Sequence, residues 1–211
     1  MTTIGTYEHA RCHAFTGMAL AVLALSTIAV AATLTEAQKN EGLAHLDRTR
    51  AALVDATKGL SEAQWRFKPG PDRWSVAEVL EHIVITEDFL LENTAQKVML
   101  APAGKADRDY KGTDKMVLSA IADRTRKAQA PEPVLPTGRW SPQEALAQFL
   151  KVRERTMEFL KSTSGSRDHV VDSPLGQPLD AYQWLLYISA HSERHTKQIL
   201  EVKADPNFPR Q

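Results

Sequence analysis

Three helix-start motifs constrain the fold of this 211-residue chain more than any other feature. Thr35, Ser75 and Ser141 are each followed three positions later by a glutamine or a glutamate. In such a capping box the hydroxyl and the later side chain bind backbone N–H groups that the first helical turn leaves without partners. The third motif also has Pro142 at the first helical position, where a missing N–H costs nothing. The sequence therefore predicts helices that begin at about residues 36, 76 and 142.

Apolar residues at helical spacing follow each motif, and a fourth segment near the C-terminus shows the same period. The expected helices cover about residues 36–60, 76–100, 142–161 and 179–203. No segment alternates apolar and polar residues over the length of a strand. We therefore expect an all-α protein, built as a four-helix bundle.

A long connection joins the second and third expected helices. It spans about forty residues, contains Pro131, Pro133, Pro136 and Gly138, and has one modest helical candidate at about 113–127. A connection of this length can return the chain along the whole bundle. We therefore expect a long crossover, with the second and third helices parallel.

The N-terminal segment has the composition of an export signal. Residues 14–32 carry no charge, follow Arg11 and His13, and end in small residues of the kind that a signal peptidase recognises. We expect residues 1–32 to be a signal peptide, which predicts an exported protein in the periplasm or outside the cell. The alternative is a retained membrane anchor, because the uncharged stretch approaches the length of a bilayer span.

The composition of the remaining domain, residues 33–211, restricts its chemistry. The whole chain has 26 basic and 26 acidic residues, so its formal charge is zero, and no basic run favours nucleic-acid binding. The chain's single cysteine, Cys12, lies within the expected signal peptide. A disulfide and a thiolate metal site are therefore excluded from the domain, and a metal would be held by histidine or carboxylate. Membrane contact is expected only if the N-terminal segment is retained.

Three histidines are candidates for a shared metal site. His191 and His195 are four residues apart, so both imidazoles lie on the same face of the last expected helix. His82 lies about as far from the start of its helix as His195 lies from the end of the last one. If these helices are antiparallel neighbours, the three rings lie at one level. Three imidazoles would leave coordination positions open, which is typical of catalytic metal sites. The alternative is that each histidine is a hydrogen-bonded core residue.

Other residues near these histidines have both a functional and a structural interpretation. Glu78 is a candidate general base, although its position in the capping box explains it as well. Tyr187 is a candidate hydrogen-bond donor to substrate, or a buried tyrosine with some other partner. His45 is a candidate fourth ligand or outer-shell group. We expect Trp74 to pack across the start of its helix, and Arg194 to lie on the solvated helix surface.

Two segments resemble a known family. They are residues 74–83, with the sequence WSVAEVLEHI, and residues 191–199, with the sequence HSERHTKQI. Both resemble the DinB-like (YfiT-like) superfamily of proposed metalloenzymes. The resemblance implies a four-helix bundle with a long crossover between helices 2 and 3, and a divalent metal held at His82, His191 and His195. It also implies metal-dependent reactions, among them thiol-dependent S-transfer, and frequent pairing as homodimers.

These observations lead to three functional hypotheses. The first is a metal-dependent hydrolase or thiol-dependent transferase that acts on an unidentified small molecule. The second is a metal-binding envelope protein without catalytic activity, and the third is a metal-free helical interaction module. Three neutral imidazoles suit Zn²⁺, Ni²⁺, Fe²⁺ or Mn²⁺, and we favour zinc or nickel.

Overall fold

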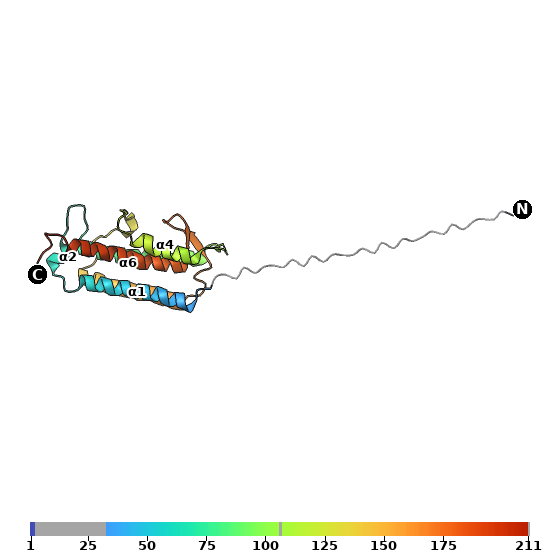
Figure 1. Ribbon diagram of the computed structural model, residues 1–211, viewed down its shortest axis with the longest axis horizontal. Coiled ribbons are helices and arrows are strands. Elements are labelled where there is room, and N and C mark those ends of the chain that lie inside the picture. Colours follow the sequence, from blue (N-terminus) through green and yellow to red (C-terminus); the bar gives the residue numbers. More distant parts are fainter. Residues whose placement is uncertain (3–32, 106, 211) are drawn as a thin grey trace.

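Four long helices form the body of the computed structural model, which describes residues 1–2, 33–105 and 107–210 (Figure 1). They are α1 (Glu36–Thr57), α3 (Val76–Gln96), α5 (Pro142–Ser162) and α6 (Ala181–Lys203). The shorter elements are α2 (Glu62–Arg66), η1 (Val98–Leu100), α4 (Tyr110–Ala122), η2 (Glu132–Val134), β1 (Val170–Asp172) and β2 (Pro178–Asp180).

Side-chain caps fix where the long helices begin. The predicted capping boxes at Thr35, Ser75 and Ser141 are all formed, so α1, α3 and α5 begin where the sequence predicted. The last helix begins later than expected, at Ala181 instead of residue 179. Its cap is Asp180, whose carboxylate accepts the N–H of Gln183.

A short hairpin explains this later start. Strand β2 pairs antiparallel with β1, and Val171 lies opposite Leu179. The sequence analysis identified no strand at this point. Each strand has only three residues, which is too short to show a period of two in the sequence. The fold is nevertheless mostly helical, as predicted.

Helices α1 and α6 lie side by side and run in the same direction (Figure 1). Near the start of both helices, the Tyr182 hydroxyl donates to the Gln38 carbonyl at 2.7 Å. Near their ends, the Lys203 ammonium donates to the Ala56 carbonyl at 2.6 Å. The same end of the bundle holds α2 and the C-terminus, where Gln64 donates to the Pro209 carbonyl.

Helix α3 packs against α6 in the opposite direction. Val79 and Leu80, near the start of α3, share a core cluster with Ile199 and Val202, near the end of α6. At the other end of the bundle, Leu91 of α3 shares a second cluster with residues at the start of α6. This antiparallel packing is the condition under which the three histidines were predicted to meet.

Helix α5 runs parallel to α3. Val79, near the start of α3, shares a core cluster with Ala145, near the start of α5. Leu91, near the end of α3, shares the second cluster with Leu160, near the end of α5. The long connection from α3 to α5 is therefore a crossover, as predicted from its length.

Within the crossover, α4 lies along α6 (Figure 1). It ends at Ala122, whereas the sequence predicted a helix to about residue 127. The chain turns at Asp123, whose carboxylate accepts the N–H of Thr125, and whose carbonyl accepts a hydrogen bond from Arg194 of α6. These contacts take the place of further helical turns.

No helix in the described ranges is long and apolar enough to cross a membrane. The predicted signal peptide, apart from its first two residues, lies outside the described part of the chain.

A buried ion pair connects all four long helices. The guanidinium of Arg153 donates two hydrogen bonds of 2.7 Å to the carboxylate of Glu87, and their side chains are 0% and 1% exposed. Arg153 also donates to the Leu46 carbonyl, the Thr49 hydroxyl and the Ser192 hydroxyl. Because every donor has an acceptor, the pair offsets much of the cost of removing these charges from water.

We expect Arg153→Met to lower the free energy of unfolding by about 3–5 kcal/mol, because it leaves the Glu87 carboxylate buried without a counter-charge. Urea denaturation followed by circular dichroism measures the loss. A double variant, Glu87→Leu with Arg153→Met, should recover a large part of it, since both charges are then removed. A loss below about 1 kcal/mol in the single variant would contradict this account of the pair.

Candidate metal centre

Three histidine side chains meet between α3 and α6. One ligand nitrogen from each of His82, His191 and His195 lies within 4.8 Å of the other two. The Nε2 atoms of His82 and His191 are 3.2 Å apart, and the ring centroids of His191 and His195 are 4.3 Å apart. His82 and His195 are buried, whereas His191 is partly exposed and forms the accessible edge of the cluster. The three histidines thus lie together, as their spacing predicted.

In His82 and His195, hydrogen bonds at Nδ1 determine which ring nitrogen carries the proton. Nδ1 of His82 lies 2.7 Å from the Val134 carbonyl, which can only accept, so this Nδ1 is protonated. Nδ1 of His195 lies 2.8 Å from Oε1 of Gln198, which also accepts a hydrogen bond from Arg124. Nδ1 of His195 is therefore protonated as well. In both neutral rings the lone pair is then on Nε2, the nitrogen available for a metal.

The cluster fits a divalent transition ion. Around a tetrahedral ion with metal–nitrogen bonds of about 2.0–2.1 Å, neighbouring ligand nitrogens lie about 3.3 Å apart. The separation of 3.2 Å between the Nε2 atoms of His82 and His191 is close to this value. Two imidazole lone pairs at such a distance repel each other unless a proton or a cation lies between them. The donor set contains only imidazole nitrogen, which suits zinc, nickel and iron.

Burial keeps the three histidines neutral. It lowers the pKa of His82, despite the hydrogen bond to Val134. Burial and the neighbouring His195 lower the pKa of His191 well below its usual value of 6.5. Burial, with the neighbouring His82, lowers the pKa of His195 to about 3. The neutral form that binds metal is therefore the form present in the folded protein at neutral pH.

Glu81, beside His82 in the chain, is a buried carboxylate that the sequence analysis did not identify. It is 3% exposed and accepts hydrogen bonds from the N–H groups of Thr137, Gly138 and Arg139, at 3.0, 2.8 and 3.2 Å. Burial acts to raise its pKa, but these hydrogen bonds outweigh burial, and the pKa is lowered. The sequence signal that was available is a charged residue between Leu80 and Ile83 on the buried side of the helix.

Glu78 is engaged in the cap of α3. One carboxylate oxygen accepts the N–H of Ser75 at 2.8 Å, and the other pairs with the Lys68 ammonium at 2.7 Å. Both oxygens thus have partners outside the histidine cluster, in line with the capping interpretation.

Tyr187 lies one turn before His191 on α6, and burial raises the pKa of its hydroxyl. Its ring centroid is 5.4 Å from that of Trp184. Within the described part of the chain, the Trp184 indole N–H is buried without a hydrogen-bond partner. Tyr187 and Trp184 therefore place two polar groups along the α6 face that leads to His191.

Three other residues can now be placed. Trp74 packs beside the cluster, with its ring centroid 4.9 Å from that of His82. His45, the candidate fourth ligand or outer-shell group, is not part of the three-histidine cluster. The expectation that Arg194 is a solvated surface residue was wrong. Arg194 is half-buried and donates to the carbonyls of Asp123 and Arg126, and thereby holds the chain that follows α4.

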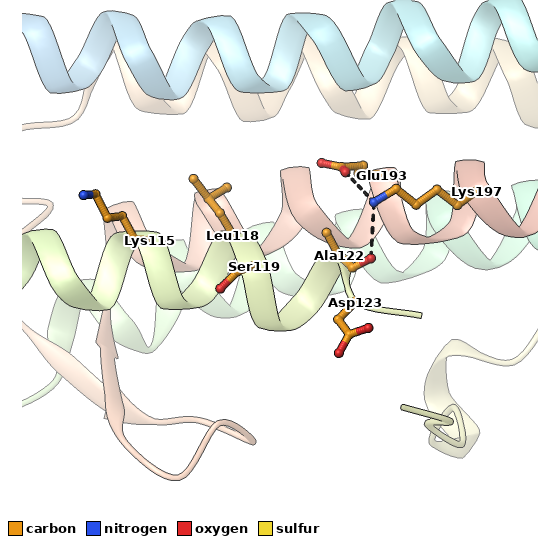
Figure 2. A pocket seen from close by; sticks show the side chains of 7 residues that line it. All are labelled: Lys115, Leu118, Ser119, Ala122, Asp123, Glu193 and Lys197. Carbon is orange, nitrogen blue, oxygen red and sulfur yellow. Dashed lines mark hydrogen bonds and ion pairs between the residues drawn. The ribbon is translucent and has the colours of Figure 1, made fainter. Parts of the chain in front are cut away.

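A surface depression of about 490 Å³ lies between α4 and α6 (Figure 2). Lys197 crosses it and binds the Glu193 carboxylate at 2.7 Å and the Ala122 carbonyl at 3.5 Å. Residues 193 and 197 lie on the opposite side of α6 from His195, because residues two apart in a helix point about 160° away from each other. The depression is therefore distinct from the metal centre.

A crossover bundle with three histidines between two antiparallel helices defines a class of helical proteins with a candidate metal centre. Residues 45–199 match the family model described as the DinB superfamily, and the chain belongs to this superfamily.

A relative and a solved structure, both from Bacillus subtilis, were also found. The chain is 31% identical over 159 residues to the uncharacterized protein YuaE of strain 168, which covers 74% of this chain and 94% of YuaE. It also matches the structure of YfiT, described as a probable metal-dependent hydrolase with an unusual four-helix bundle topology. That match has a TM-score of 0.54 and 16% identity, and covers 83% of this chain and 91% of YfiT. The likeness to YfiT shows the fold.

For the metal-free protein, we expect the free energy of unfolding to decrease as the pH falls from about 7 to 5. The folded histidines have lowered pKa values, so they stay neutral where the unfolded histidines, with pKa values near about 6.5, take up protons. Urea denaturation in the presence of a chelator measures the slope. His191→Gln should reduce it by up to about 1.4 kcal/mol per pH unit, and an unchanged slope in this variant would contradict the neutral state of His191 in the folded protein.

Proposed function

We propose that the protein binds one divalent transition ion through His82, His191 and His195 and acts as a metal-dependent enzyme, either a hydrolase or a thiol-dependent transferase. The observation that carries this proposal is the convergence of three imidazoles, two of which have Nε2 lone pairs fixed by hydrogen bonds at Nδ1. The description of YfiT as a probable metal-dependent hydrolase supports it. Zinc and nickel are the ions that we favour.

A bound ion would supply a Lewis acid with coordination positions open to a substrate. The protein's own residues would control access and orientation. Trp74 packs against one side of His82 and shields it from water, whereas the partly exposed His191 leaves the approach open. We propose that a small-molecule substrate enters at this edge, where the hydroxyl of Tyr187, one turn before His191, is the candidate hydrogen-bond donor to it.

We further propose that the protein is exported and that it acts in the periplasm or outside the cell. The uncharged segment 14–32 and its small-residue end support export. Pairing as a homodimer is also proposed, from the resemblance to the family.

We expect close to one equivalent of a transition metal per chain in protein purified without a histidine tag. His82→Ala and His191→Ala should each lose the metal, since either change removes one of three ligands. His45→Ala is the matched control and should keep it, because His45 lies outside the cluster. Elemental analysis by mass spectrometry measures the content.

If the parent protein contains no metal, even after reconstitution with zinc, nickel, iron and manganese, the metalloenzyme proposal is wrong. If the metal is present, reconstituted protein should be screened for ester and amide hydrolysis and for thiol transfer. Activity that His191→Ala abolishes would support an enzyme, and a full set of negative results would favour a metal-binding role without catalysis.

A further inference from the structure

The carboxylate of Glu81 attaches the crossover to the helix that carries the first histidine ligand. Three successive backbone N–H groups, those of residues 137–139, point at this one buried carboxylate. Oε1 accepts from Thr137 and Arg139, and Oε2 accepts from Gly138. Successive amides directed at one anion form a specific binding arrangement for a negative charge. The turn is thus held by the ionised form of Glu81.

The same segment of the crossover provides the shorter of two contacts at Nδ1 of His82; the other is the Thr86 hydroxyl of α3, at 3.4 Å. Val134 lies three residues before the anchored turn, is buried, and its carbonyl is 2.7 Å from Nδ1 of His82. Pro136 lies between the two points and restricts the backbone that joins them. The position of the Val134 carbonyl therefore depends on where Glu81 holds the turn.

We propose that Glu81 is a positioning residue of the metal centre. By anchoring residues 137–139, it places the Val134 carbonyl, which keeps Nδ1 of His82 protonated and directs Nε2 toward the ion. This inference rests on the proposed function, because it assigns Glu81 a role in the metal site formed by the three histidines. The alternative is that Glu81 only stabilises the fold.

The direct test is Glu81→Gln in the full-length chain. Both oxygens of the Glu81 carboxylate accept backbone N–H groups. In the glutamine variant, the side-chain NH₂ replaces one of these oxygens in either orientation, so it faces a backbone N–H and a hydrogen bond is lost. Zinc affinity, measured by competition with a chromophoric chelator, should fall by about tenfold or more, as is typical when an outer-shell partner of a ligand is lost. In the metal-free variant, the ¹⁵N signals of His82 should change from a single Nδ1-protonated form to a mixture of the two tautomers.

Glu144→Gln is the matched control. It makes the same change in charge on α5, where the carboxylate binds Ser141 in a capping box. This variant should keep the parental zinc affinity and the parental His82 signals.

Gly138→Ala is a second variant in the anchored turn. Gly138 has φ of +73°, and an added Cβ meets nothing within 4 Å, so the substitution strains only the backbone. It should change the His82 signals in the same direction as Glu81→Gln.

Parental zinc affinity and parental His82 tautomer in Glu81→Gln would overturn the inference, even if the variant unfolds more easily. If the parent protein binds no metal, the proposed function fails. The tautomer of His82 in the metal-free chain still decides the role of Glu81 in that case, because this measurement needs no ion.

Discussion

The antiparallel packing of α3 on α6 is the constraint on which the site depends. It brings the start of one helix to the end of the other, so that His82 meets His191 and His195 at one level. Farther along α3, Glu87 accepts two hydrogen bonds from the buried Arg153 of α5. Arg153 also donates to Ser192 of α6 and Leu46 of α1, and so ties the four helices together. The cost of burying these charges is offset only when the four helices keep their positions. The core polar network and the histidine cluster therefore require the same helix arrangement.

The crossover between α3 and α5 contacts the histidine cluster, although its sequence does not indicate this role. It reaches the histidines at two points, through the Val134 carbonyl on His82 and through Arg124, which shares Gln198 with His195. Arg194 of α6 also donates to the carbonyls of Asp123 and Arg126, and so holds the segment that follows α4. These contacts set the protonation of the ring nitrogens, which is why the ligands can face one ion as neutral imidazoles.

Local chemistry made much of the fold predictable, and long-range pairing accounts for what was missed. Capping boxes depend on residues three apart, so the starts of α1, α3 and α5 could be read from the sequence. The spacing of His191 and His195, and the depth of His82 in its helix, predicted the cluster on the condition that the two helices are antiparallel neighbours, which the structure meets. Glu81 and Arg153 have charged side chains that are usually solvated, and only their partners far along the chain explain their burial. The hairpin before α6 was missed because its strands are shorter than any recognisable alternation.

The account has one central claim, that three imidazoles of α3 and α6 bind a single ion. X-ray absorption spectroscopy of the metal-loaded protein tests it most directly, because it reports the type, number and distance of the ligand atoms. With zinc, we predict a first shell that contains three imidazole nitrogens at about 2.0–2.1 Å, with the outer-shell scattering that imidazole rings produce. A first shell made of oxygen atoms alone, or one with a single imidazole, would contradict the claim.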